Sequence, residues 1–75
     1  MAEIDVTAQM QAGVFRIHVE EGQEIDEGDT IVTLESMKME IPVPAPVRGV
    51  VNEVVVAEGD GVDDGDVMLR ISETK

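Results

Sequence analysis

The chain has 75 residues, no Cys, no Trp and no Tyr, and its formal net charge is −12 at pH 7. This length predicts one domain, residues 1–75, and the lack of cysteine excludes disulfides and thiolate metal sites. The acidity argues against binding to nucleic acid or to anionic membranes, and it favours solubility and contact with basic partner surfaces. The sequence shows no bilayer-spanning apolar stretch and no signal peptide, so we expect a cytoplasmic protein that is a monomer in isolation.

Short apolar runs rich in β-branched residues predict strands, and no segment keeps a helical period. In the second strand, alternation predicts that Phe15, Ile17 and Val19 face the core. His18 lies on the opposite face, where we expect an exposed residue rather than a catalytic or metal-binding group. The six predicted strands lie near residues 3–7, 14–20, 30–35, 39–43, 49–56 and 67–72.

The second half of the chain repeats the first at an ungapped shift of 37 positions, with halves at about 8–34 and 45–71. Glycines recur at turn positions, where positive φ favours glycine, and Ile25 and Val62 are expected to anchor the loops between them. Two such halves predict a quasi-two-fold β-sandwich or flattened barrel. The identical pairs include Ala8 with Ala45, Val19 with Val56, Glu21 with Glu58, Gly22 with Gly59, Asp26 with Asp63, Gly28 with Gly65, and Asp29 with Asp66.

Lys38 lies in the link between the two halves, and its counterpart under the shift is Lys75. These are the only lysines of the chain. The repeat predicts that Lys38 occupies one corner of the domain and that the chain termini occupy the opposite corner. Prolines at 42, 44 and 46 predict an edge strand or an extended crossover directly after this link, because proline cannot donate to a ladder.

The motif Glu35-Ser36-Met37-Lys38-Met39-Glu40 resembles the attachment motif of biotinyl domains, the biotin carboxyl carrier family. The resemblance extends from about Ile4 to Ser72 and includes the Ala45–Val51 segment, Glu58-Gly59-Asp60 and Gly65-Asp66. The chain departs from the family pattern in three places, and none of them touches the lysine. They are Ser36 where Ala is common, Ala12 where Gly is expected, and Gln9 where Pro is frequent.

The resemblance implies an all-β fold of two four-stranded antiparallel sheets, without an inserted thumb, and with Lys38 at the tip of a tight, strained hairpin. It further implies that a biotin protein ligase attaches biotin to Lys38. The biotin would then carry a carboxyl group between biotin carboxylase and carboxyltransferase sites. Met37 and Met39 are expected to serve recognition, and Glu35 is a candidate contact for the ligase. Met10 and Met68 are expected to pack in the interior.

Three other functions are compatible with a small acidic β domain, and the residues disfavour each of them. A lipoyl carrier would use the same lysine, but Met on both sides of Lys38 favours biotin over the Asp-Lys-Ala usual in lipoyl domains. An unmodified interaction module would have no need of a lysine between methionines. A metal-binding module is disfavoured because Val62 and Ile71 break the spacing of a calcium loop that would start at Asp60. No nucleophile stands beside a base in a recognisable motif, so a non-catalytic carrier is expected.

Overall fold

In the computed structural model, residues 2–74 are described, and they form a sandwich of two four-stranded antiparallel sheets with no helix in that part of the chain. The predicted all-β fold is therefore confirmed, and the two sheets do not close into a barrel. The molecule measures 37 × 18 × 17 Å. One sheet has the order β1 (Glu3–Thr7), β8 (Val67–Glu73), β6 (Gly49–Val54), β3 (Glu24–Ile25). The other has the order β5 (Met39–Pro44), β4 (Thr30–Ser36), β2 (Ala12–Ile17), β7 (Gly61–Val62).

The internal repeat appears in the structure as a quasi-two-fold arrangement. A shift of 37 residues moves β2, β3 and β4 onto β6, β7 and β8, and each sheet contains strands from both halves. Equivalent hydrogen bonds cross between the halves: the Gly22 N–H donates to the Val51 carbonyl, and the Gly59 N–H to the Val14 carbonyl, both at 2.8 Å. Because each half completes the other's sheet, neither half has a complete sheet alone.

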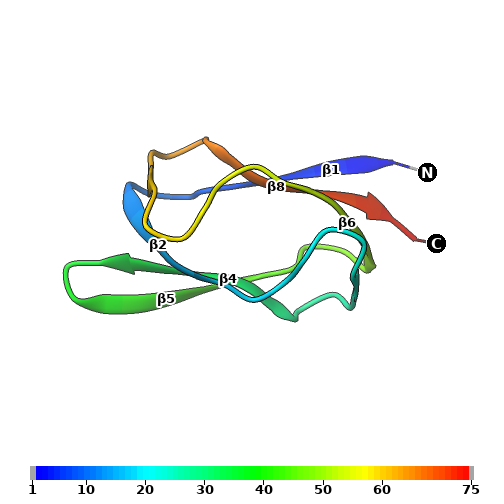
Figure 1. Ribbon diagram of the computed structural model, residues 1–75, viewed down its shortest axis with the longest axis horizontal. Helices are drawn as coiled ribbons and strands as arrows, with labels where there is room; N and C mark the ends of the chain where they lie inside the picture. Colours follow the sequence, from blue (N-terminus) through cyan, green and yellow to red (C-terminus); the bar gives the residue numbers. More distant parts are fainter. Residues whose placement is uncertain (1, 75) are drawn as a thin grey trace.

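The β4–β5 hairpin projects from one end of the molecule, and both chain termini lie at the other end (Figure 1). This is the separation of corners that the repeat predicted for Lys38 and the termini. Lys75, the predicted counterpart of Lys38, lies outside the described residues.

Four glycine turns have the positive φ predicted for them, between 89° and 95°, at Gly22, Gly28, Gly59 and Gly65. Three of these turns are closed by the aspartate that follows the glycine, and in one of them Asp60 accepts the N–H of Ala57 at 2.9 Å. Asp29 accepts the N–H of Asp26 at 2.9 Å, and Asp66 accepts the N–H of Asp63 at 2.8 Å. The repeated Gly-Asp pair is therefore explained by turn geometry: glycine provides the backbone conformation and the carboxylate satisfies a backbone donor.

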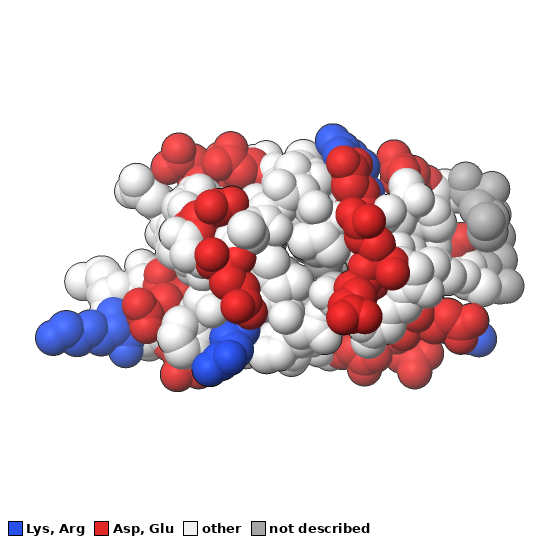
Figure 2. All heavy atoms as spheres, in the orientation of Figure 1, with Lys and Arg blue, Asp and Glu red and all other residues white. Residues whose placement is uncertain are grey.

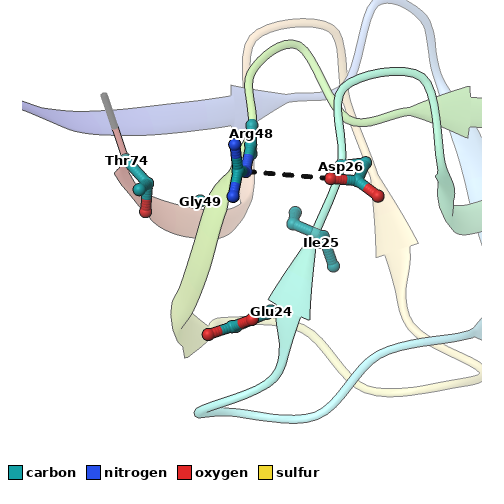
Figure 3. Close-up of a pocket in the computed structure, with 6 residues that line it drawn as sticks. All are labelled: Glu24, Ile25, Asp26, Arg48, Gly49 and Thr74. Atoms are coloured by element: carbon teal, nitrogen blue, oxygen red, sulfur yellow. Dashed lines mark ion pairs between the residues drawn. The ribbon is translucent and has the colours of Figure 1, made fainter.

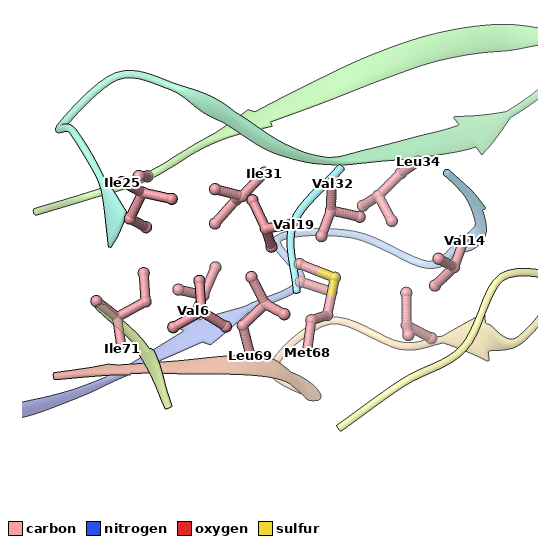
Figure 4. Close-up of a cluster of buried hydrophobic side chains, with 14 residues drawn as sticks. Val6, Val14, Val19, Ile25, Ile31, Val32, Leu34, Met68, Leu69 and Ile71 are labelled. Atoms are coloured by element: carbon pink, nitrogen blue, oxygen red, sulfur yellow. The ribbon is translucent and has the colours of Figure 1, made fainter. Parts of the chain in front are cut away.

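The core fills the space between the sheets with aliphatic side chains (Figure 4). Ile25 and Val62 are each 4% exposed, which confirms their predicted role as loop anchors, and Met68 is fully buried as expected. Each buried Val, Leu or Ile contributes roughly 1.5–3 kcal/mol by leaving water, so this core can hold a chain of this size without cross-links. Its members are Val6, Ala8, Val14, Val19, Ile25, Ile31, Val32, Leu34, Ala45, Val51, Val62, Met68, Leu69 and Ile71.

The second strand differs from its prediction in both bounds and facing. β2 begins at Ala12 and ends at Ile17, and Phe15 is 40% exposed instead of buried. The cause is a bulge against β4: Val14 pairs with Leu34 and Arg16 pairs with Thr33, so Phe15 has no partner in this ladder. A bulge resets the in-out alternation, and the prediction for Phe15 was wrong for this reason.

Smaller differences follow from pairing between distant segments. The two-residue strands β3 and β7 were not predicted, and β6 ends at Val54 rather than at residue 56. Met10, expected inside, is 38% exposed. His18 is exposed as predicted, and its Nε2 lies 2.8 Å from the Thr33 Oγ1. The proline-containing β5 is an edge strand, which confirms that prediction.

Candidate functional site

The β4–β5 hairpin ends in a two-residue turn formed by Met37 and Lys38. Ser36 and Met39 form the last pair of the ladder, and φ is 53° at Met37 and 64° at Lys38. Positive φ at both central residues is the backbone of a type I′ turn, whose twist matches that of the strands it joins. The expected tight hairpin is confirmed, and Lys38 is at its tip.

The turn is set by the strands and not by its own residues. Neither Met nor Lys favours positive φ, and each L-residue held there costs about 1–2 kcal/mol. The pairing of β4 with β5 offsets this cost, since β4 is anchored in the core by a buried run from Ile31 to Leu34. Met37 and Lys38 are the only non-glycine residues with positive φ among residues 2–74, so the backbone strain is concentrated at this tip.

All three residues of the Met-Lys-Met motif are presented to solvent. Met37 is 91% exposed, Met39 is 65% exposed, and Lys38 is exposed between them. Within residues 2–74, no carboxylate lies within 4.0 Å of the Lys38 ammonium. A primary amine held out in water without an ion-pair partner is accessible to an acylating enzyme.

Two carboxylates stand just behind the tip on one face of the hairpin. Glu35 and Glu40 are directly opposite each other in the ladder, and both are exposed. Glu35 alternates with the buried Leu34, so this face is the outer one, away from the core. Like charges directly opposite each other destabilise a strand pair, and their presence is therefore not explained by folding.

The charge pattern separates the tip from the rest of the surface. At the hairpin end of the molecule, basic atoms project beyond acidic groups, and acidic side chains run in bands over the visible face (Figure 2). The net charge of −12 makes the tip a positive point on a negative body. A partner that approaches the tip therefore meets one amine, two thioethers and an acidic rim.

A different hollow, of about 220 Å³, lies near the chain termini. Arg48 and Asp26 face each other across it (Figure 3), with 3.9 Å between the Arg48 Nε and the Asp26 Oδ1. These side chains are 70% and 80% exposed. Exposed pairs of this kind contribute little, and nothing in the hollow gathers the groups that a reaction needs. It is lined by Glu24, Ile25, Asp26, Arg48, Gly49 and Thr74.

Other kinds of site find no support in the described part of the chain. Residues 2–74 hold no cluster of three His, Asp or Glu side chains that could bind a metal ion, and they contain no helix long and apolar enough to cross a membrane. The structure thus brings Lys38, Met37 and Met39 together at one tip, with Glu35 close behind. Sequence reasoning did not identify Glu40 as the direct partner of Glu35, although this follows from the register of a two-residue hairpin.

The chain resembles known proteins in both sequence and fold. Residues 3–71 match the family model described as "Biotin-requiring enzyme" (Biotin_lipoyl). Among curated proteins, biotinylated protein TB7.3 homolog of Mycolicibacterium smegmatis is 62% identical over 42 residues, which cover 56% of this chain and 58% of that protein. The biotin/lipoyl attachment protein of Bacillus subtilis is 46% identical over 37 residues, covering 49% of this chain and 51% of that protein. The chain therefore matches little more than half the length of these relatives.

Solved structures contain the same fold within much larger chains. A single-chain, multi-domain long-chain acyl-CoA carboxylase matches with a TM-score of 0.91 and 32% identity, over 96% of this chain and 7% of the other. The urea carboxylase of Kluyveromyces lactis matches with a TM-score of 0.88 and 24% identity, over 96% of this chain and 6% of the other, which shows the fold alone. In both cases the region similar to this chain is a small part of an enzyme.

Proposed function

The chain belongs to the biotin-requiring enzyme family, whose model spans residues 3–71, and from this premise we propose that it is a covalent biotin carrier with Lys38 as the attachment residue. The observation that carries the proposal is the tip itself. Lys38 is exposed, has no ion-pair partner among residues 2–74, and is held on a strained two-residue turn between two exposed methionines.

Attachment requires a biotin protein ligase that supplies biotinyl-adenylate. The Lys38 Nζ, after losing a proton, attacks the acyl carbon; an amide bond forms, the acyl–phosphate bond breaks and AMP leaves. The Met37 and Met39 thioethers give the ligase flexible apolar contacts at the tip, a use that suits unbranched, polarisable side chains. Glu35, which faces outward behind the tip, is a contact for a basic group of the ligase.

The attached biotin would carry a carboxyl group between two enzyme sites. A biotin carboxylase uses ATP and bicarbonate to replace a ureido N–H by N–CO₂⁻, and a carboxyltransferase passes this group to an acceptor. The lysine and biotin chain has about ten single bonds and extends well beyond ~10 Å. Such a tether replaces bimolecular encounters with an effective concentration in roughly the millimolar range. The domain contributes this tether and no catalytic group.

The relatives favour an acyl-CoA acceptor. One of them is the biotin-dependent acyl-coenzyme A carboxylase alpha3 subunit of Mycobacterium leprae, 54% identical over 37 residues, although the match covers only 6% of that protein. A long-chain acyl-CoA carboxylase is also among the structural matches at 32% identity. We infer that this carrier works with biotin carboxylase and carboxyltransferase components in the cytoplasm, on a substrate of this class.

The proposal is tested by co-expression with a biotin protein ligase in medium containing biotin, followed by streptavidin detection. Wild type and Lys38→Arg are compared with Lys75→Arg, the matched control that removes the only other lysine. We expect label on wild type and Lys75→Arg and none on Lys38→Arg. Label that persists in a folded Lys38→Arg protein would refute the assignment. A lipoyl group in place of biotin, detected by a lipoyl-specific antibody, would replace the proposed cofactor.

A second comparison tests the role of the methionines. Met37→Ala combined with Met39→Ala should leave the fold intact because both side chains are exposed. Loss of two partner contacts worth roughly 1.4 kcal/mol together would slow labelling about tenfold. Met10→Ala, which removes an exposed methionine that lies outside the hairpin, serves as the control and should label at the wild-type rate. Equal labelling rates for wild type and both variants would show that the ligase does not depend on contacts with the two thioethers.

A further inference from the structure

A second hollow, of about 300 Å³, lies directly behind the hairpin on the sheet that carries it. It crosses β2 from Glu35 on one side to Gly59 on the other, and it is lined by Gly13, Val14, Phe15, Glu35 and Gly59. This hollow could not be predicted from the sequence, because it depends on the bulge in β2 and on the pairing of β2 with β7.

The hollow has a floor of bare backbone. Gly13 stands opposite Glu35 in β4 and opposite Gly61 in β7, so these three residues share the outer face of the sheet. A Cβ added to Gly13 would meet nothing closer than 3.9 Å, and one added to Gly61 would meet nothing within 4 Å. Packing therefore does not require glycine at either position, and the space above them is open.

One wall is the only aromatic side chain of the protein. The bulge turns Phe15 outward to 40% exposure, and the Arg16 guanidinium carbon lies 5.4 Å from the centre of its ring. A phenylalanine gains roughly 1.5–3 kcal/mol from full burial, so part of this gain is forgone where the ring stays in water. The fold does not use this surface, and it is free to receive an apolar group.

The opposite wall is Glu35, the member of the carboxylate pair behind the lysine that lines the hollow. Glu35 lies three residues before Lys38, a separation of roughly 10 Å even along a fully extended chain. The lysine and biotin arm is at least as long as this. Among possible occupants, the group on Lys38 is the one permanently tethered beside the hollow, at an effective concentration of roughly millimolar.

We propose that this hollow is a resting site for the uncarboxylated biotin of the same chain, an inference that rests on the proposed function. The two ureido N–H groups are donors that the Glu35 carboxylate can accept, and the sulfur-containing ring is an apolar body that fits against Phe15. The glycine floor lets the flat ureido ring approach the backbone closely. Recognition of this kind needs no further protein.

The same site rejects the charged form of the cofactor. Carboxylation replaces one ureido N–H by a carboxylate, which removes a donor and adds a negative charge beside Glu35 and its neighbour Glu40. Like charges at close range in a partly desolvated site repel. The hollow therefore holds biotin before carboxylation and releases it afterwards, so that the loaded arm is free to reach the second enzyme.

The test uses the full chain, biotinylated on Lys38 and checked by intact mass, in a nuclear magnetic resonance comparison with the unmodified protein. We expect biotinylation to shift the amide signals of Gly13, Phe15 and Gly59, and we expect nuclear Overhauser contacts between the biotin rings and the Phe15 ring. Asn52, the counterpart of Phe15 in the other half, should not shift. Phe15→Ala should abolish the shifts at Gly13 and Gly59, whereas Val55→Ala, at another exposed apolar position, should keep them.

Failure of the resting site and failure of the carrier function give different results. A protein that carries biotin but shows no contact between its rings and Phe15, with shifts confined to the tip, would overturn the resting site and leave the carrier function standing. A folded protein that accepts no biotin would overturn both. Persistence of the Gly13 and Gly59 shifts in biotinylated Phe15→Ala would also overturn the site as described.

Discussion

Replacing Lys38 by glycine should make the domain more stable, although it removes the proposed attachment residue. Lys38 has φ of 64°, and holding an L-residue there costs about 1–2 kcal/mol. Glycine avoids that cost but loses roughly 0.5–1 kcal/mol more conformational entropy on folding. The net gain is about 0.5–1 kcal/mol. For a domain of this size, 1 kcal/mol moves Tm by about 4–8 °C, so Tm should rise by about 2–8 °C.

Thermal unfolding followed by far-ultraviolet circular dichroism measures this change, because the chain has no Trp and no Tyr to give a fluorescence signal. Lys38→Arg is the matched control, since it keeps a long side chain at the same φ and should unfold within about 2 °C of wild type. If Lys38→Gly unfolds at or below the temperature of Lys38→Arg, the turn is not strained, and the view that the strands impose it would be refuted.

Three other substitutions test the fold that holds the hairpin, each by the same unfolding measurement. Gly49→Ala places a Cβ 2.2 Å from the Ser72 carbonyl oxygen and should lower the free energy of unfolding by about 3 kcal/mol or more. Its control, Gly61→Ala, places a Cβ in open space and should lower it by less than about 1 kcal/mol. Equal losses would contradict the packing described. Gly28→Val, at φ 92°, should lower stability by about 1–3 kcal/mol, and an unchanged Tm would contradict the turn assignment. Glu58→Ala removes a carboxylate that accepts the Ile17 N–H at 3.0 Å, and it should lower the free energy of unfolding by about 0.5–1.5 kcal/mol. Glu27→Ala is the neutral control. Equal stability of the two variants would show that this hydrogen bond contributes nothing.

The internal repeat explains why much of the fold could be predicted from the sequence. Its glycine turns and loop anchors are local features: positive φ favours glycine, and an aliphatic residue between two turns has only the core to pack against. Ile25 and Val62 were identified in this way and are buried. One further repeat pair, Val14 with Val51, is identical and buried on both sides, and it could have been read from the same shift.

The features that the sequence did not reveal depend on pairing between distant segments. The β2 bulge exists only against β4, so local alternation placed Phe15 in the core. The strands β3 and β7 have two residues each and form only because each pairs with a strand of the other half. Gly49 and Ala12 are equivalent in the repeat, yet Gly49 pairs with Glu73 of β8, whereas the ladder between β2 and β4 starts only at Gly13. A Cβ on Gly49 would meet the Ser72 carbonyl oxygen at 2.2 Å.

The hairpin tip was predicted only in part from the pattern of its own residues. Neither turn position, Met37 or Lys38, holds the Gly, Asn or Asp that favours a type I′ turn. Periodicity alone would therefore have continued the strand through them. The turn was predicted from the resemblance of the Met-Lys-Met motif to biotinyl domains, and the backbone angles confirm it. The exposure of Met37 and Met39 follows from this turn, because their side chains stand beyond the end of the core.

The most direct test of the account is the intact mass of the protein after co-expression with a biotin protein ligase, with fragmentation to locate the adduct. The account predicts one biotinyl group per chain, in amide linkage to Lys38. A folded protein with no adduct, or with the adduct on Lys75, would contradict it.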